Sequence, residues 1–434
     1  MLPSTKRRPD QSRKAVEFFN AVRSENVKKV KMMIGKREFD VNEKDVADKK
    51  SPTPLLIAAE KGNFEIVKLL LKAKPRPADV NAQDKTGKRA IWYAARYGHK
   101  EMAEWLLGAK GQECEVDYLD PASGCTPLFT GILANHADVC RMIIHAGADV
   151  NLRRLGFNEN SESPLIKAIQ MDNLEIVDML CNSLCNMEAK TEDGLTALHY
   201  AVAYRRYDIT EYLLENSVKI QAETHQGVTA MAISVEHFLP AMCRILIEFG
   251  YKMNKAYKWK ETPLEHAIKL HSEDCAMIMV QWGCKLKHPN RKISYFELAI
   301  KEGLIRLAKL MIQIRPEFLQ EPWVKQKHIH LSIYKKPEFY KLIFELSKSP
   351  LPLFELCRSQ IFKHLGKYAV SKVKKLPIPE KMKDFLRCEE HFSKDAYEKV
   401  PLDKKECPFD CPSYCDSWDC PPIDIEPDDT ELDL

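Results

Sequence analysis

Four cysteines near the C-terminal end of the sequence have the spacing closest to that of a metal site. Cys407, Cys411, Cys415 and Cys420 fall within fourteen residues, and four thiolates are a common ligand set for Zn²⁺. The spacing is C-x3-C-x3-C-x4-C, however, and differs from the two-residue spacing of compact zinc knuckles. Neither a histidine nor an apolar framework surrounds these cysteines. We therefore expect exposed or partly buried thiols and no metal, with a zinc site as the alternative.

Sequence patterns of catalytic sites are missing from the chain. It contains no glycine-rich phosphate-binding loop, no G-x-S-x-G, no H-E-x-x-H and no paired-carboxylate motif. Cys357 looks like a nucleophile only if its apolar neighbours Leu353, Leu356 and Ile361 are ignored. We predict a protein that is not an enzyme and that needs no cofactor.

The composition is that of a soluble globular protein. The chain has 434 residues and a net charge of +4, which gives no reason to expect nucleic acid or a membrane surface as a partner. No apolar run reaches about 18 residues, the length that spans a bilayer. The basic N-terminus has no apolar stretch behind it, so we expect no secretory signal. We predict a cytoplasmic protein, with the nucleus as a further location, whose 14 cysteines are reduced and mostly buried.

A self-similar unit fills most of the chain. Its clearest copy begins with Thr53-Pro54-Leu55, continues through Gly62 and ends with Asp79-Val80-Asn81. Thr53 suits a helix N-cap, Pro54 the first helical turn, and Gly62 the break between two antiparallel helices. The residues in the leucine position are Leu55, Ile91, Leu128, Leu165, Leu198, Met231, Leu264 and Phe296, which lie 32–37 residues apart. The pattern predicts a repeated helix–turn–helix unit with a hairpin loop.

With a degenerate first copy over 15–42, the sequence predicts nine units in an all-α solenoid. The last copy has lost much of the pattern, as a terminal cap does. The predicted organisation is a disordered N-terminus at 1–14, the repeats at 15–320, linking or capping helices at 321–349, a small helical module at 350–388 and a disordered, Cys-rich acidic tail at 389–434.

The longer intervals between repeats place extra residues in the loops that follow the second helix. In such an array these loops are hairpin fingers on the binding side, and insertions there often mark the contact surface. We predict that three fingers contact a partner, with tolerated insertions as the alternative: 74–88, 110–124 and 151–163. On the last finger, Arg153 and Arg154 next to Phe157 are the candidate binding residues.

The segment 349–366 reads as one short helix. Pro350 and Pro352 suit its first turn, and Gly366 suits its end. One face of this helix carries residues four apart, with Leu356 beside them: Leu353, Cys357, Ile361 and Leu365.

A stiff extended strip, Leu376-Pro377-Ile378-Pro379, separates this helix from the next one. About forty residues are too few to bury a core alone, so we expect the apolar face to dock partly on the repeats and partly on a partner. A helix pair that only caps the array is the alternative, but it leaves the Leu-Pro-Ile-Pro strip unexplained.

These motifs resemble a known family. The repeats, with a period near 33 and a Thr-Pro-Leu start, resemble ankyrin repeats. Leu353-x-x-x-Cys357-x-x-x-Ile361 resembles the elongin-binding BC box, and the strip from Leu376 to Pro379 resembles the one that selects cullin-5. Together the segment from Leu353 to Leu386 resembles a SOCS box, so the chain is similar to the ankyrin repeat and SOCS box family.

The resemblance implies a substrate-recognition adaptor of a ubiquitin ligase that contains elongin B, elongin C, cullin-5 and a RING protein. The implied elongin-binding residues are Leu353, Leu356, Cys357 and Ile361, and the implied cullin-binding residues are Leu376, Pro377, Ile378 and Pro379. The ankyrin array would hold a protein substrate, for which Arg153, Arg154 and Phe157 are the candidates. An ankyrin scaffold that recruits no ligase is the alternative function.

Overall fold

The computed structural model describes residues 9–36, 40–109, 111–154, 162–257, 261–287 and 294–321, and the single residues Val324, Ile361, Val373, Lys375, Leu376 and Lys383. Within these ranges the regular elements are α-helices and one 3-10 helix. Isolated antiparallel bridges such as Gln83–Arg89 occur in the loops. The predicted all-α class is therefore confirmed. The chain divides into two compact units, the first reaching Glu192 and the second beginning at Asp193.

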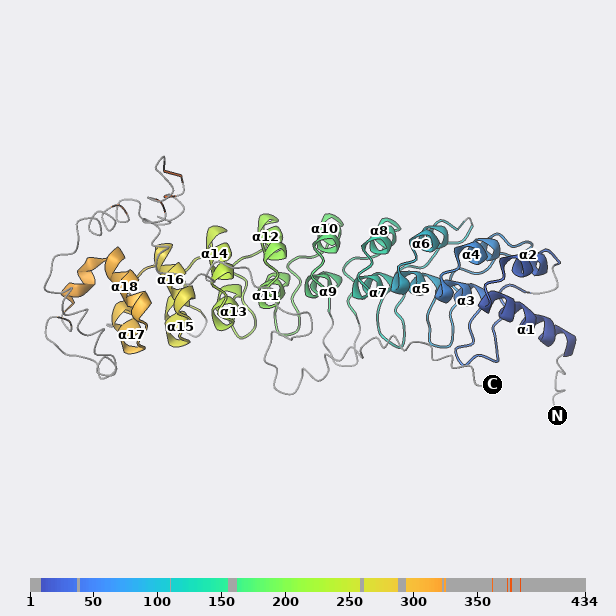
Figure 1. Cartoon of the computed structure of the whole chain (residues 1–434), viewed down its shortest axis with the longest axis horizontal. Coiled ribbons are helices and arrows are strands. Elements are labelled where there is room, and N and C mark those ends of the chain that lie inside the picture. The colour runs from blue at the N-terminus through green and yellow to red at the C-terminus, as the bar shows by residue number, and fades with distance from the viewer. Residues whose placement is uncertain are drawn as a thin grey trace. The chain divides into compact units, whose positions relative to one another are not determined.

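The first unit is built from helix pairs joined by short turns. Within it the odd-numbered helices form one row and the even-numbered helices a second row (Figure 1), and neighbours such as α3 and α5, or α5 and α7, pack against each other. The pairs are α1 (Pro9–Arg23) and α2 (Val27–Gly35), α3 (Pro54–Lys61) and α4 (Phe64–Leu71), α5 (Ala90–Tyr97) and α6 (Lys100–Leu107), α7 (Pro127–Leu133) and α8 (Ala137–His145), and α9 (Pro164–Gln170) and α10 (Leu174–Asn182).

The second unit repeats the same construction and ends with a 3-10 helix, η1 (Pro316–Gln320). One continuous hydrophobic core runs through it from Leu198 to Leu319. Its pairs are α11 (Ala197–Ala203) and α12 (Tyr207–Glu215), α13 (Ala230–Glu236) and α14 (Pro240–Glu248), α15 (Pro263–Lys269) and α16 (Glu273–Gln281), and α17 (Tyr295–Lys301) and α18 (Ile305–Ile314).

The positions that define the repeat in the sequence form the core. The eight marker residues, from Leu55 to Phe296, are each no more than 3% exposed, so each first helix turns this residue inward. The described ranges contain nine helix pairs, as the sequence predicts. The first pair begins earlier than expected: α1 starts at Pro9, inside the segment predicted to be disordered. A proline fits the first turn of a helix because its fixed φ is already helical.

Threonine or serine is the N-cap of the odd-numbered helices from α7 to α17 and of α3, whereas α5 has Arg89 there. The hydroxyls of these residues act differently. The Thr126 hydroxyl accepts a hydrogen bond from the Phe129 amide at 3.1 Å, and Ser163 does the same for Ile166 at 3.3 Å. Thr53 occupies the N-cap position of α3 without making a side-chain cap bond. The predicted N-cap position of Thr53 is confirmed, but its hydroxyl makes no capping hydrogen bond, and Pro54 occupies the first turn of the helix.

The turn inside each helix pair uses a left-handed residue. At Gly62 and Gly98, φ is +75° and +72°. An added Cβ would lie 2.5 Å from His99 Cε1 at Gly62 and 2.6 Å from His136 Nδ1 at Gly98, so only glycine fits there. Other pairs place a larger residue in the same conformation: Asn135, Asp172, Arg205, Phe238 and His271.

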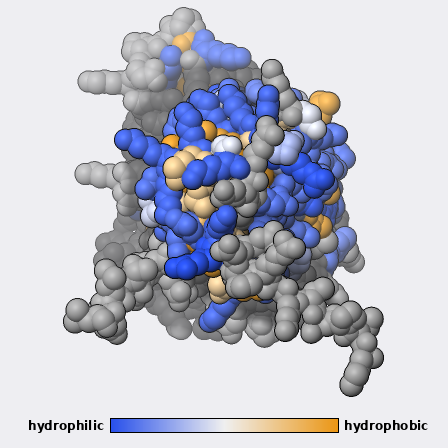
Figure 2. Space-filling model, turned by 90° about the vertical axis from the view of Figure 1, so that its right-hand side faces the viewer, coloured by the Kyte–Doolittle hydropathy of each residue, from blue (hydrophilic) through white to orange (hydrophobic). Residues whose placement is uncertain are grey.

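The end of the molecule that carries α1 and α2 is mainly hydrophilic, with small separate hydrophobic areas (Figure 2). Val16 and Met32 are the large apolar side chains of these two helices with about half of their surface exposed, at 49% and 52%. Within the described ranges, no helix combines the length and the apolar character needed to cross a membrane.

Candidate functional site

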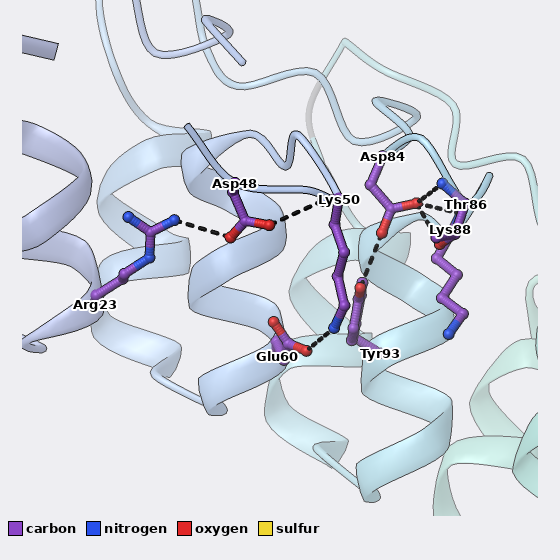
Figure 3. A network of polar contacts seen from close by, with 8 residues as sticks. All are labelled: Arg23, Asp48, Lys50, Glu60, Asp84, Thr86, Lys88 and Tyr93. Carbon is purple, nitrogen blue, oxygen red and sulfur yellow. Dashed lines mark hydrogen bonds and ion pairs between the residues drawn. The ribbon is translucent and has the colours of Figure 1, made fainter. Parts of the chain in front are cut away.

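A network of polar side chains lies where the first fingers of unit 1 meet the odd-numbered helices (Figure 3). Its best-connected member is Asp84, which is buried. Asp84 Oδ1 accepts hydrogen bonds from the amides of Thr86 and Lys88 at 2.8 and 3.0 Å and from the Thr86 hydroxyl at 2.6 Å. Asp84 Oδ2 accepts from the Tyr93 hydroxyl at 3.0 Å. One carboxylate thus closes the finger turn and fixes the finger to α5.

The same position carries an aspartate in the fingers on either side. Asp45 and Asp120 each stand five residues after the corner that opens their finger, as Asp84 does. Asp45 accepts from the Ala47 amide at 3.0 Å, and Asp120 accepts from the Ala122 amide at 3.0 Å. The period of these aspartates is visible in the sequence and is the signal that marks the network. Side chains that bond their own backbone two residues on favour such turns.

Three ion pairs complete the network. Arg23 on α1 donates to Asp45 and Asp48 at 2.6 and 3.0 Å. Lys50, at the base of the first finger, donates to Glu60 on α3 at 2.9 Å. These contacts hold the first finger against two different helices. Because the pairs are partly exposed, each contributes at most about 1 kcal/mol.

The fourth finger departs from this pattern. Arg154 occupies the place that Asp45, Asp84 and Asp120 hold in the earlier fingers. Its guanidinium Nε donates to the Ser123 carbonyl oxygen of the preceding finger at 3.1 Å, and Arg153 donates to the Lys190 carbonyl oxygen of the following finger at 3.0 Å. Both arginines therefore bridge adjacent fingers and are half-buried. Phe157, the third predicted residue, lies outside the described residues.

Finger length also changes along unit 1. The Asp84 amide donates to the Lys88 carbonyl, whereas the Arg154 amide donates to the Glu162 carbonyl, in both cases across the base of the finger. The chain between these partners is therefore longer in the fourth finger. The prediction that long fingers contact a partner stays a prediction.

Most of the predicted adaptor-binding residues lie outside the described residues: Leu353, Leu356, Cys357, Pro377, Ile378 and Pro379. Ile361 is helical and 37% exposed. Leu376 is half-buried, and its amide donates to the carbonyl oxygen of Val373, a fully buried residue, at 3.0 Å. The described structure thus contains one residue from each predicted motif.

The cysteines of the described ranges are all free thiols. Burial raises the pKa of Cys140 to about 12 and that of Cys284 to about 12, so these thiols stay protonated and unreactive. No cluster of three or more His, Cys, Asp or Glu side chains that could hold a metal ion occurs in the described ranges. The four tail cysteines lie outside them.

Two histidines on first helices of repeats, His199 on α11 and His266 on α15, make contacts between repeats. His199 accepts from the Thr196 amide at 3.1 Å and lies 3.3 Å from the Val228 carbonyl oxygen of the next repeat. His266 Nε2 lies 3.2 Å from a Glu236 carboxylate oxygen of the preceding repeat. Both side chains connect neighbouring repeats and so have a structural role.

Family comparisons agree with this architecture. The ankyrin repeat family matches residues 18–120, 77–154 and 155–224, and the SOCS box family matches residues 349–387. The chain is an ankyrin repeat and SOCS box protein. Its helix pairs continue to α18, beyond the last ankyrin match. The SOCS box match includes all the residues predicted to bind elongin C and cullin-5.

Similar proteins share mainly the repeats. An ankyrin repeat protein of fowlpox virus, FPV223, is 28% identical over 142 residues, which are 32% of this ankyrin repeat and SOCS box protein and 92% of the viral one. The E3 ubiquitin-protein ligase XBAT33 of Arabidopsis thaliana is 31% identical over 156 residues, 36% of this chain and 27% of that protein. The ankyrin repeat protein L371 of Acanthamoeba polyphaga mimivirus is 24% identical over 194 residues, 44% of this chain and 24% of that protein.

Among solved structures, the human ASB11 ankyrin repeat domain is 21% identical with a TM-score of 0.42, over 50% of this chain and 92% of that one. Of the three curated relatives, the chain spans most of the fowlpox protein but about a quarter of each of the other two. Ankyrin repeats with a SOCS box fit a substrate adaptor of a ubiquitin ligase, and they are consistent with a protein that has no catalytic site of its own.

Proposed function

We propose that this protein is the substrate-recognition subunit of a ubiquitin ligase that contains elongin B, elongin C, cullin-5 and a RING protein. The observation that carries the proposal is the presence of an ankyrin array and a SOCS box in one chain. The array supplies a large protein-binding surface, and the SOCS box supplies the connection to the ligase.

The elongin C contact is assigned to the helix face that carries Leu353, Leu356, Cys357 and Ile361. Ile361 keeps 37% of its surface exposed, which supports a role in binding outside the chain. Burying an aliphatic side chain of this kind contributes about 1.5–3 kcal/mol before the costs of association. Several such residues are therefore needed for a stable complex. The strip Leu376-Pro377-Ile378-Pro379 is assigned to cullin-5.

The substrate contact is assigned to the fingers of unit 1, with Arg153, Arg154 and Phe157 on the longest of them. The hydrogen bonds of Arg153 and Arg154 to neighbouring fingers hold the base of this finger in place. Fixing the base reduces the entropy lost when a partner binds.

The mechanism is one of proximity. The array binds the substrate while the SOCS box tethers the ubiquitin-charged conjugating enzyme, so the two reactants meet at a high effective concentration. The adaptor forms and breaks no covalent bond. Its contribution to rate lies in positioning alone.

The experiment that tests the ligase assignment is co-expression with elongin B and elongin C. The variant Leu353→Ala with Cys357→Phe should lose both elongins during purification while its helical circular dichroism stays unchanged. Replacing the strip from Leu376 to Pro379 by alanines is the matched variant: it should keep the elongins and lose cullin-5. Elongin binding that survives the first variant would refute the assignment of this helix face. An unchanged chain that binds no elongins would be a scaffold without this ligase.

Substrates can be sought by proximity labelling in cells. Proteins labelled by the whole chain and stabilised when residues 350–388 are deleted are candidate substrates. Shortening the finger between residues 154 and 162 should reduce their recovery while elongin binding stays intact. Unchanged recovery would rule out this finger as a substrate contact.

A further inference from the structure

One face of α5 combines aromatic rings with positive charges that have no acidic partner among the described residues. We call it the α5 face, and it consists of Lys88, Trp92, Tyr93, Arg96 and Tyr97. On a helix, residues four apart lie above one another, so Trp92–Arg96 and Tyr93–Tyr97 form two parallel columns. Lys88 joins them from the second finger.

The rings of the α5 face hold one another in place. Trp92 and Tyr93 meet edge to face, with centroids 5.2 Å apart, and Tyr93 stacks on Tyr97 at 6.5 Å with an interplanar angle of 17°. The Lys88 ammonium lies 4.1 Å from the centroid of the Trp92 ring. Tyr97, at the outer end, is 48% exposed. The surface is therefore ordered before any partner arrives.

The carboxylates near the α5 face are already occupied. Both oxygens of Asp84 accept hydrogen bonds from Thr86, Tyr93 and the Lys88 amide, and Glu60 is bound by Lys50. Figure 3 shows the Lys88 side chain extending away from Asp84. Within the described ranges, neither Lys88 nor Arg96 forms an ion pair.

Arg96 is the clearest case of a positive charge that has no ion pair in the described ranges. Its side chain is half-buried, and burial lowers its pKa. A charge that loses part of its hydration without gaining an acidic partner opposes folding. A half-buried arginine on a helix face that also carries three aromatic side chains is instead well suited to a partner carboxylate, since the guanidinium fork matches carboxylate geometry.

We infer that the α5 face binds an acidic, extended segment of the ligase substrate. Arg96 takes one carboxylate in a bidentate contact, Lys88 takes a second, and Tyr97 packs against an apolar side chain between them. The choice of an acidic partner follows from charge complementarity with the two unpaired cations. This inference rests on the proposed function, because it names the class of segment that the array presents to the ligase.

The test uses the full-length protein and fluorescein-labelled peptides of about twelve residues in which Glu alternates with Leu and Ser. Peptides with Gln in place of Glu are the control probes. We expect the acidic peptide to raise fluorescence anisotropy on binding and the Gln peptide to bind at least about tenfold more weakly, since charge-assisted hydrogen bonds are lost. The acidic complex should weaken as salt is added.

Three variants locate the site. Arg96→Gln and Lys88→Gln should each weaken the acidic complex by about tenfold, and Arg96→Lys should restore only part of the affinity because lysine lacks the planar fork. Lys72→Gln is the matched control, since Lys72 is the exposed C-cap residue of α4, a helix of the even-numbered row. It should leave the affinity unchanged.

Equal affinity for Glu and Gln peptides, equal affinity of the Arg96→Gln and Lys72→Gln variants, or no binding up to about 1 mM would overturn the inference. Binding that appears only after residues 421–434 are removed would also overturn it, because the chain's own acidic end would then be the occupant. The elongin co-purification is independent of all these results. If it fails, the proposed ligase function falls, whereas failure of the peptide test alone removes only this inference.

Discussion

Replacing Asp84 by alanine removes the residue that holds the second finger to α5. Three of its four hydrogen bonds come from Thr86 and Lys88, which are half-buried and can bind water once the carboxylate is gone. The fourth comes from the Tyr93 hydroxyl, and Tyr93 is only 2% exposed. Burial and the nearby Asp84 charge raise the pKa of Tyr93 above its usual value, so the hydroxyl stays a donor.

The loss of stability can be estimated by treating the donors that water can reach and the buried Tyr93 hydroxyl separately. An orphaned buried hydroxyl costs about 1–3 kcal/mol, and loss of the turn hydrogen bonds to solvent-accessible donors costs about 1 kcal/mol more. We therefore expect Asp84→Ala to destabilise this part of unit 1 by about 3 kcal/mol. Tyr93→Phe removes the hydroxyl itself and should cost about 1 kcal/mol. In the double variant the orphaned donor is absent and its cost disappears, so the combined loss of stability should fall about 2 kcal/mol short of the sum of the two single effects.

Hydrogen exchange measured by mass spectrometry is the suitable assay, because repeat arrays open locally and a single global midpoint would average over both units. A loss of about 3 kcal/mol should reduce the protection of the α5 amides by about a hundredfold. Asp79→Ala is the control, since exposed Asp79 accepts one hydrogen bond from Asn81 at the edge of the same finger. It should change protection by less than about tenfold.

Two results would contradict this account. If Asp84→Ala and Asp79→Ala reduce protection equally, the buried network contributes no more than an exposed turn. If the effects of Asp84→Ala and Tyr93→Phe add fully, the hydroxyl and the carboxylate do not interact. Either outcome would also remove the reason for regarding Lys88 as a free cation.

Three further predictions concern turns and a histidine. Gly98→Ala should destabilise unit 1 by at least about 2 kcal/mol, because φ is +72° and the new Cβ meets His136, whereas Gly147→Ala, with φ +93° and nothing within 4 Å, should cost about 1 kcal/mol in a urea titration. Leu184→Gly should stabilise by about 0.5–1 kcal/mol, because Leu184 has φ +60° and is 89% exposed; a lower urea midpoint would contradict this. Burial, and then the charge of His136, lower the pKa of His99, so the folded chain binds fewer protons than the unfolded chain near neutral pH. The urea concentration at the unfolding midpoint should therefore decrease as the pH is lowered from about 7.5 to about 5.5. His99→Asn should reduce that fall, and an unchanged pH dependence would contradict the assignment.

The repeat positions could be predicted from the sequence because they follow one local rule. Markers such as Leu55 and Leu128 follow Thr-Pro, which suits the start of a helix, and precede a turn residue at the same distance, Gly62 and Asn135. The beginning of α1 at Pro9 could not be predicted in this way, because the first copy lacks the Thr-Pro-Leu start.

The candidate site was harder to predict because its chemistry depends on which charges are left unpaired. Arg96 and Lys50 are both basic residues of the repeats, and the sequence does not show which of them has an acidic partner. In the structure Lys50 is bound by Glu60, whereas Arg96 has no ion pair in the described ranges. The contacts of Arg153 and Arg154 with neighbouring fingers also arise from packing between repeats. Such contacts join residues about thirty positions apart, and the repeat period alone does not predict which side chains meet.

The left-handed turn between paired helices has a consequence for how the adaptor could acquire new partners. The same backbone conformation accommodates glycine at Gly62, asparagine at Asn135, arginine at Arg205 and phenylalanine at Phe238. At Gly62 and Gly98 a side chain would collide with a histidine of the next repeat, but Asn135, Arg205 and Phe238 show that other turns accept one. Each of those repeats therefore offers one position where recognition can change while the helices keep their places, so specificity in this protein can diverge one turn at a time.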